Sequence, residues 1–265
     1  MHEPESYHMN PVSAPLALLC SVPFECERLA AALEGAEPVT IGRKPGWAGR
    51  LGGTPVVLLP GGMGKTNAAH AATALLEARA VSGVICFGIG GAYPGSGLAL
   101  GDIALATHAI YGDEGADTPG GWIGTDAIGI PLWRGEQGAV FNDFALDAGL
   151  VHRAADALRR AGMDARTGPF VTVSACSGTD ALGRERGERF GALCEGMEGA
   201  AAAHVCAVYG VPFLEVRAVS NHVEDRDMAR WRIGPAVQAA QDAVLALAQA
   251  WPRIRNTTPT EPNHG

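Results

Sequence analysis

The 265-residue chain lacks long apolar runs: no segment reaches the roughly 18 uninterrupted apolar residues that a membrane-spanning helix needs. Its opening segment, MHEPESYHMNPVSAP, is polar and acidic and has neither the basic nor the apolar stretch of a secretory signal. Positive charge is also scarce, because 20 Lys and Arg against 28 Asp and Glu leave a net charge of −8 at pH 7. Proteins that bind phosphate backbones are normally basic. We therefore expect a protein with neither a nucleic-acid nor a membrane partner.

Paired cysteine and histidine motifs are absent as well. None of the six cysteines belongs to a C-x-x-C pair, and the eight histidines are scattered without metal-ligand spacing. Most of the cysteines lie in apolar runs, which is typical of buried free thiols in a reducing cytoplasm. We expect a cytoplasmic protein with no metal and no cofactor. The cysteines are Cys20, Cys26, Cys86, Cys176, Cys194 and Cys206.

Glycine, by contrast, is abundant. The chain has 36 glycines among 265 residues, about twice the usual ~7%. They show no G-X-Y period, which excludes collagen, and a hydrophobic content of 47% excludes a disordered chain. The composition predicts a globular protein with many tight backbone turns.

Apolar runs of strand length alternate with helical patterns along the chain. This alternation predicts an α/β fold whose mostly parallel or mixed sheet lies between helices, with ligands at the carboxyl ends of the strands. We expect one domain over residues 14–252, with disordered tails at 1–13 and 253–265 and a mobile segment at 112–126. The predicted strands are 17–20, 56–59, 84–87, 103–106, 170–173 and 213–219, and the predicted helices are 24–33, 65–80, 146–158, 200–209 and 234–251.

Two glycine-rich turns come close to nucleotide-binding motifs. Residues 60–66, PGGMGKT, miss the first glycine of the phosphate loop because Leu59 occupies its position. Residues 88–91, GIGG, miss the third glycine of the dinucleotide fingerprint because Tyr93 occupies its position. Both nucleotide sites remain alternatives to simple turns where the backbone passes close to a small flat ligand.

Polar side chains at strand and helix ends are the candidate catalytic groups. Glu198 stands at a glycine-flanked helix start, Asn221 ends a predicted strand, and Glu25 follows the first strand. Each has a structural alternative, as a helix N-terminal carboxylate or a turn residue. Cys176 follows another strand and is an alternative nucleophile, although an apolar setting makes a thiol inert.

These segments together resemble the nucleoside phosphorylase/nucleosidase superfamily. The resemblance covers roughly residues 16–250 and is carried by GMEGAAAAHVCAVYGVPFLEVRAVSN (196–221), FGIGGAYPGSGLALGDIALAT (87–107) and GGMGKTNAA (61–69). Within the superfamily, FGIGGAYPGSGL, IYGDEG (110–115) and SNHVEDRDMARW (220–231) are most similar to the futalosine hydrolases of menaquinone biosynthesis. The resemblance implies a single-domain, three-layer α/β/α fold with a central mixed sheet.

The resemblance also implies roles for individual residues. Glu25 matches the carboxylate that activates the attacking water, and Glu198 matches the one that binds the ribose hydroxyls, with Met197 beneath the sugar. Asn221 stands where adenine-specific members carry Asp. An amide can donate hydrogen bonds to both N7 and O6 of a 6-oxopurine, so hypoxanthine is the expected leaving base.

The remaining expectations concern the substrate's surroundings. The phosphorylases of this superfamily bind phosphate with Arg and Ser, where this chain has Cys86 and Ile89, so water is the expected nucleophile. The implied activity is hydrolysis of futalosine to hypoxanthine and dehypoxanthine futalosine by a homodimer or homotetramer. The alternatives are an adenine-type nucleosidase acting on methylthioadenosine, S-adenosylhomocysteine or aminodeoxyfutalosine, a purine nucleoside phosphorylase, and a purine-binding module without catalysis. The implied binding residues are Gly88, Ile89, Gly90, Gly91, Ala175 and Cys176, with Tyr111, Arg226 and Arg230 toward the 5′ substituent.

Overall fold

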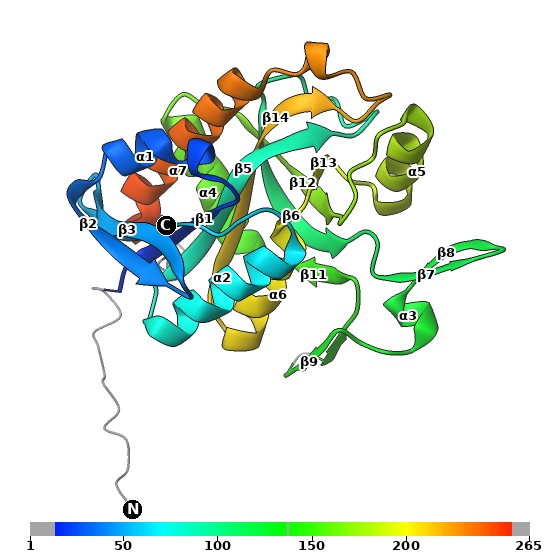
Figure 1. The fold of residues 1–265 in the computed structure, drawn as a ribbon, viewed down its shortest axis with the longest axis horizontal. Helices are drawn as coiled ribbons and strands as arrows, with labels where there is room; N and C mark the ends of the chain where they lie inside the picture. The colour runs from blue at the N-terminus through cyan, green and yellow to red at the C-terminus, as the bar shows by residue number, and fades with distance from the viewer. Residues whose placement is uncertain (1–13, 137, 256–265) are drawn as a thin grey trace, which may run out of the picture.

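A mixed sheet of ten strands forms the centre of the computed structural model, which describes residues 14–136 and 138–255 (Figure 1). The neighbouring strands run in the order β11-β6-β12-β13-β5-β1-β4-β3-β2, and β14 pairs with both β5 and β6. Because β6, β12, β13, β5 and β14 pair in a circle, this half of the sheet closes on itself. The strands of the sheet are β1 (Leu16–Cys20), β2 (Glu34–Ile41), β3 (Lys44–Leu51), β4 (Thr54–Pro60), β5 (Gly83–Ala92), β6 (Ile103–Tyr111), β11 (Asp143–Ala145), β12 (Ala165–Thr172), β13 (Cys194–Gly196) and β14 (Phe213–His222).

Helices cover both faces of this sheet. Side chains alternate between the faces of a strand, and β1 shows the consequence. Leu16 and Leu18 belong to the core formed with α1, α4 and α7, whereas Ala17 and Leu19 belong to the core formed with α2 and α6. The expected three-layer α/β/α architecture is therefore confirmed. The helices are η1 (Pro23–Glu25), α1 (Glu27–Ala31), α2 (Lys65–Ala78), α3 (Thr125–Ile128), α4 (Ala148–Arg160), α5 (Asp180–Phe190), α6 (Gly199–Tyr209), η2 (Met228–Arg230) and α7 (Ile233–Ile254).

Parallel pairing brings several strand ends to one edge of the sheet. β1 pairs in parallel with β4 and β5, and β14 pairs in parallel with β5. The register of β14 shifts between Val219 and Asn221, where Ser220 is the extra residue, so that Val219 pairs with Gly90 and Asn221 with Gly91. This bulge places Asn221 beside the end of β5.

The glycine-rich run after residue 87 is part of a strand, not a turn. β5 continues through Gly88, Gly90 and Gly91 to Ala92. The predicted strand therefore stopped too early, because glycine is rare in ordinary strands and is used here for close approach of other groups. No helix follows β5 in the chain, since β6 is the next element, which removes the basis for a dinucleotide-binding turn.

The structure also differs from the predicted elements near the two ends of the domain. The helix predicted over 24–33 is divided into η1 and the short α1, and the strands β2 and β3 occupy a polar, glycine-containing region that carries little apolar periodicity. The final helix extends to the buried Ile254, beyond the domain end expected at 252. The predicted tail residues 1–13 and 256–265 lie outside the described residues.

Two hairpins accompany the sheet: β7 (Gly115–Thr118) with β8 (Gly121–Gly124), and β9 (Trp133–Gly135) with β10 (Gly138–Val140). The β7–β8 hairpin lies within residues 112–126, the segment expected from composition to be mobile, and it projects from the body of the molecule (Figure 1). Among the described helices, none has the length and apolar character that crossing a bilayer requires.

Candidate active site

A pocket of ≈ 300 Å³ opens where β1, β5 and β14 end and α6 begins. It brings together most of the residues singled out from the sequence, although they are up to about 200 positions apart in the chain. The pocket is lined by Ser21, Val22, Phe24, Glu25, Met63, Ile89, Gly90, Gly91, Cys176, Glu195, Gly196, Met197, Glu198, Arg217, Ser220, Asn221, Arg226 and Trp231.

Glu25 is a buried carboxylate held by backbone amides. Its Oε2 accepts hydrogen bonds from the Ser21 and Val22 amides at 3.0 and 3.3 Å, and its Oε1 accepts one from the Ile89 amide at 3.0 Å. Burial raises the pKa of Glu25, while the nearby Arg217 guanidinium and the amides oppose that rise. A carboxylate with a raised pKa and fixed orientation is suited to take a proton from water.

Glu198 forms the N-cap of α6 and lines the same pocket as Glu25 and Arg217. Its Oε1 accepts from the Gly64 amide at 2.9 Å, and its Oε2 accepts from Arg217 Nη2 at 3.2 Å. The side chain is buried. Its Oε2 also accepts from the Met197 amide at 3.3 Å, whereas Oε1 retains a lone pair with which it can accept from a ligand hydroxyl.

The contacts of Gly64 and Lys65 argue against a phosphate loop over residues 60–66. The Gly64 amide, which would face a phosphate, donates to Glu198. The Lys65 ammonium donates to Asp113 at 2.6 Å and to Glu114 at 2.7 Å, and Lys65 does not line the pocket. The GGMGK turn therefore serves to hold a carboxylate.

Arg217 is the main site residue that sequence reasoning missed. It is 2% exposed, and it bonds Glu215 through Nε at 2.9 Å as well as Glu198. A signal was available: Glu215 and Arg217 are two charged residues at strand spacing within the otherwise apolar run FLEVRAVS. Charged residues are almost never fully buried unless they are paired, so this run indicates an internal ion pair.

Asn221 presents an oriented amide at the pocket. Its Oδ1 accepts from the Ser220 hydroxyl at 2.8 Å, and its Nδ2 donates to the His222 carbonyl at 3.0 Å. An amide nitrogen carries two hydrogens, so one donor remains for a ligand. The bulge at Ser220 and this pair of hydrogen bonds together fix which end of the amide donates.

Glu195 is a second pocket residue to which the sequence assigned no role. Its carboxylate accepts from the Ser177 amide at 2.7 Å, the Ser177 hydroxyl at 2.6 Å and the Tyr93 hydroxyl at 2.9 Å. These bonds tie the loop that carries Cys176 to β13 and β5. Cys176 itself is exposed, unlike the other five cysteines, and partial burial raises the pKa of its thiol, which weighs against a nucleophilic role.

Two of the three residues expected at the 5′ side lie elsewhere. Tyr111 lines a different cavity on the α6 side of the sheet, where its hydroxyl lies 3.3 Å from His204 Nδ1. Arg230 is exposed and pairs with Glu224 at 2.7 Å. Arg226 does line the pocket, with its guanidinium 4.7 Å from the centroid of the Trp231 ring.

Two of the expected binding residues do not line the pocket either. Ala175 is exposed outside it. At Gly88, a Cβ would overlap Glu25 Oε1. This glycine therefore makes room for a side chain of the protein and not for a ligand.

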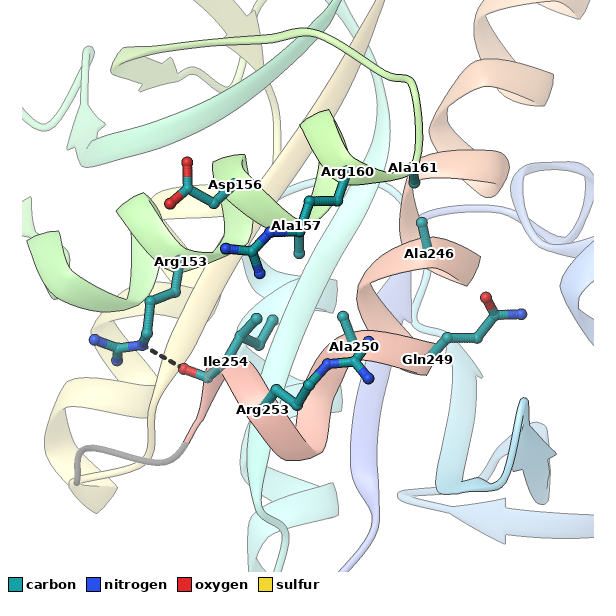
Figure 2. Close-up of a pocket in the computed structure, with 10 residues that line it drawn as sticks. All are labelled: Arg153, Asp156, Ala157, Arg160, Ala161, Ala246, Gln249, Ala250, Arg253 and Ile254. Carbon is teal, nitrogen blue, oxygen red and sulfur yellow. Dashed lines mark hydrogen bonds between the residues drawn. The ribbon is translucent and has the colours of Figure 1, made fainter. Parts of the chain in front are cut away.

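A separate pocket of ≈ 340 Å³ lies between α4 and α7 (Figure 2). It is lined by Arg153, Arg160 and Arg253, and its single carboxylate, Asp156, is bound to Arg159 at 2.6 Å. Figure 2 shows Arg153 turned to the end of α7, where its Nε donates to the Ile254 carbonyl at 2.6 Å. This pocket has no pair of acids that could act on a bound molecule. Over residues 14–136 and 138–255, no three His, Cys, Asp or Glu side chains gather as a metal-binding group.

Comparison with known proteins defines the class of protein that this fold and pocket represent. The family model of the phosphorylase superfamily matches residues 15–250. The chain belongs to the phosphorylase superfamily, and the expected resemblance is confirmed.

The curated relatives of this chain include futalosine hydrolases. The chain is 37% identical to the futalosine hydrolase of Thermus thermophilus over 201 residues, which cover 76% of this chain and 84% of the relative. It is 34% identical to the futalosine hydrolase of Acidothermus cellulolyticus over 242 residues, which cover 91% and 93% of the two chains.

Solved structures agree on the fold. The 5′-methylthioadenosine/S-adenosylhomocysteine nucleosidase of Neisseria meningitidis, in complex with methylthio-immucillin-A, aligns with a TM-score of 0.77 at 25% identity over 89% of this chain and 99% of that one. The futalosine hydrolase of Helicobacter pylori aligns with a TM-score of 0.75 at 17% identity over 90% and 98%, a likeness of fold alone.

Proposed function

We propose that this protein is an N-ribosyl hydrolase that cleaves futalosine to hypoxanthine and dehypoxanthine futalosine. The observation that carries the proposal is the pairing, in one pocket, of a buried water-activating carboxylate with an oriented amide donor. The identity of the curated relatives supports the choice of futalosine among nucleosides.

In this proposal the leaving base is bound by Asn221. One Nδ2 hydrogen donates to the base at N7 or O6, which draws electrons from the C1′–N9 bond as it breaks. The Ser220 hydroxyl keeps Oδ1 away from the base, since Oδ1 already accepts a hydrogen bond from it. A 6-oxopurine is favoured because an adenine 6-amino group would need an acceptor at the same place.

The ribose and the water are bound by the two carboxylates. Glu198 accepts from the ribose hydroxyls, and Met197 lies beneath the sugar. Glu25 takes a proton from water as the water attacks C1′ from the face opposite the base. Cleavage of N-glycosidic bonds passes through an oxocarbenium-like state, and the negative charge of Glu25 and Glu198 stabilises the cation that forms.

The charges around the pocket also favour water over phosphate. When ionised, Glu25, Glu198 and Glu215 carry −3 and Arg217 carries +1, so this buried cluster has a charge of −2. A phosphate dianion placed beside it would be repelled, and Arg217, the only buried cation among the described residues, is already bound to two carboxylates. Phosphorolysis is therefore disfavoured by the same charges that favour a cationic transition state.

The test is release of free base from futalosine, inosine and methylthioadenosine, each with and without phosphate. We expect phosphate-independent hypoxanthine from futalosine. Two rates are compared in Asn221→Asp: release of hypoxanthine from futalosine and release of adenine from methylthioadenosine. The ratio of the first rate to the second should fall by at least ~10-fold. Release of adenine by the unaltered protein, or a need for phosphate, would contradict the proposal.

The proposal includes a cytoplasmic homo-oligomer. The six cysteines are free thiols, as expected in a reducing compartment. Ile130 and Val208 are apolar and exposed at 65% and 52%, and an oligomer contact is one way in which such side chains would be covered. Light scattering on the purified protein decides between a dimer and a tetramer, and a monomer would refute this part of the proposal.

A further inference from the structure

Glu215 is a buried carboxylate that does not line the pocket. It is 2% exposed and lies on β14, two residues before Arg217 and therefore on the same face of the strand. Its Oε1 accepts from Arg217 Nε at 2.9 Å. Its Oε2 has no hydrogen-bond partner within the described part of the chain.

Such a group is costly to the fold. A buried carboxylate with one oxygen unpaired is poorly compensated, and buried ion pairs are often replaced by apolar side chains without loss of stability. Burial raises the pKa of Glu215, which reflects this cost. The stability of the fold therefore does not explain why residue 215 is a glutamate. Its contacts suggest an explanation.

Those contacts lead to both carboxylates at the pocket. Arg217 uses its remaining nitrogens to donate to Glu198 Oε2 at 3.2 Å and to the Ile89 carbonyl at 3.3 Å. The amide of the same Ile89 donates to Glu25 Oε1 at 3.0 Å. One guanidinium, fixed at Nε by Glu215, thus contacts Glu198 directly and Glu25 through Ile89.

The start of α6 is shaped to admit this carboxylate. Gly199 follows the N-cap Glu198, and a Cβ at Gly199 would overlap both oxygens of Glu215. The partial positive charge of the helix N-terminus lies beside Glu215 as a result. The residue that orients Arg217 and the helix end that carries Glu198 therefore fit together only because position 199 is glycine.

We propose that Glu215 is a positioning residue for hydrolysis: by holding Arg217 at Nε, it aims the other guanidinium nitrogens at Glu198 and at the Ile89 carbonyl. It touches no substrate and acts through Arg217. The inference rests on the proposed function, because it assigns Glu215 to the reaction in which Glu25 and Glu198 take part.

A positioning role predicts a change that simple structural support does not. Without the Glu215 charge, Arg217 is less neutralised and lowers the pKa of Glu25 further, so the acidic limb of the pH profile should move to lower pH. The neighbouring thiols stay neutral there, because burial raises their pKa values, that of Cys194 to about 12. The titratable and charged groups around Glu215 are Glu25 from η1, Cys86 from β5, Cys194 from β13, Glu198 from the start of α6 and Arg217 from β14 itself.

The experiment compares Glu215→Gln with two further variants in steady-state kinetics from pH 4 to pH 8. Glu215→Gln should lower kcat by about 10- to 10²-fold, change KM by less than ~3-fold, and move the acidic limb to lower pH. Gly199→Ala displaces the carboxylate without removing its charge, so it should lower kcat without that movement. Leu214→Val, on the opposite face of β14 in the apolar core, is the control for general loosening and should keep the kcat of the unaltered protein.

Two results would overturn the inference. One is turnover of substrate by Glu215→Gln at the rate of the unaltered protein. If Glu215→Gln does not fold, the same rate in a folded Gly199→Ala is the overturning result. The other is loss of activity by Glu215→Gln with an unmoved acidic limb, which would make Glu215 a structural residue. If the unaltered protein releases no base from futalosine, the proposed function fails; the same comparison on the nucleoside that it does hydrolyse still decides the role of Glu215.

Discussion

At Glu25, burial and hydrogen bonding act on the same carboxyl group in opposite directions. Loss of water raises its pKa, whereas Arg217 and the amides of Val22 and Ile89 lower it. The net effect is a raised pKa, so keeping Glu25 ionised at neutral pH lowers the stability of the folded protein. This is typical of catalytic groups, whose environment is set for reactivity and not for stability.

Glu25→Gln should therefore lower kcat by about 10²- to 10⁴-fold while leaving the protein at least as stable at pH 7. Because the folded pKa lies above the unfolded value of ~4.3, stability from this group is complete below pH ~4 and is lost as the pH rises through the folded pKa. The stability gained by the variant, measured by urea unfolding, should shrink as the pH falls toward 4. Glu188→Gln, on the exposed side of α5, should change neither quantity, and a fully active Glu25→Gln would exclude Glu25 as the base.

At the scale of elements, the glycines of β5 and α6 act as spaces for the protein's own charged side chains. Gly88 leaves room for the Glu25 carboxylate, and Gly199 leaves room for that of Glu215. For Gly88, the sequence suggested instead that glycine lets the backbone approach a flat ligand. Close packing of a strand and a helix around a buried charge cluster requires the same residue type, so composition does not distinguish the two uses.

Gly88→Ala tests this use of glycine in β5. The added methyl group would push the Glu25 carboxylate from its amide donors, and misplacement by about 1 Å costs up to ~10²-fold in rate. We expect a fall in kcat of at least ~10-fold, measured as base release under saturating substrate. Gly234→Ala is the matched control, since a Cβ there meets no atom within 4 Å; equal activity of the two variants would contradict the steric argument.

At the scale of the whole molecule, α7 holds the sheet together from one face. It contacts β14, β5 and β4, and its Trp251 is 1% exposed, packs against Gly83 and donates from Nε1 to the Ser82 hydroxyl at 2.8 Å. The site depends on this packing, because the ends of β5 and β14 carry its polar groups. A change far from the pocket should thus affect stability first.

Trp251→Ala should lower the free energy of unfolding by about 3–5 kcal/mol, through lost apolar burial and the cavity left behind. Chemical denaturation followed by circular dichroism measures this. Gln238→Ala, at an exposed position of α7, should cost less than ~0.5 kcal/mol. A similar small cost for Trp251→Ala would show that α7 contributes little to the core.

The α/β class, the three layers and the family followed from the residues alone, because apolar runs of strand and helix length and local motifs need no tertiary information. It also predicted Glu25, Glu198 and Asn221, which the fold brings into one pocket, although their catalytic roles remain a prediction. Which further groups join them depends on how the folded chain packs. Arg217 is set in the pocket by pairing with Glu215 and Glu198, whereas Tyr111 and Arg230 are drawn elsewhere by His204 and Glu224. The physical reason is that the partners of a buried charge are decided by the packing of distant segments, which no local pattern of residues records.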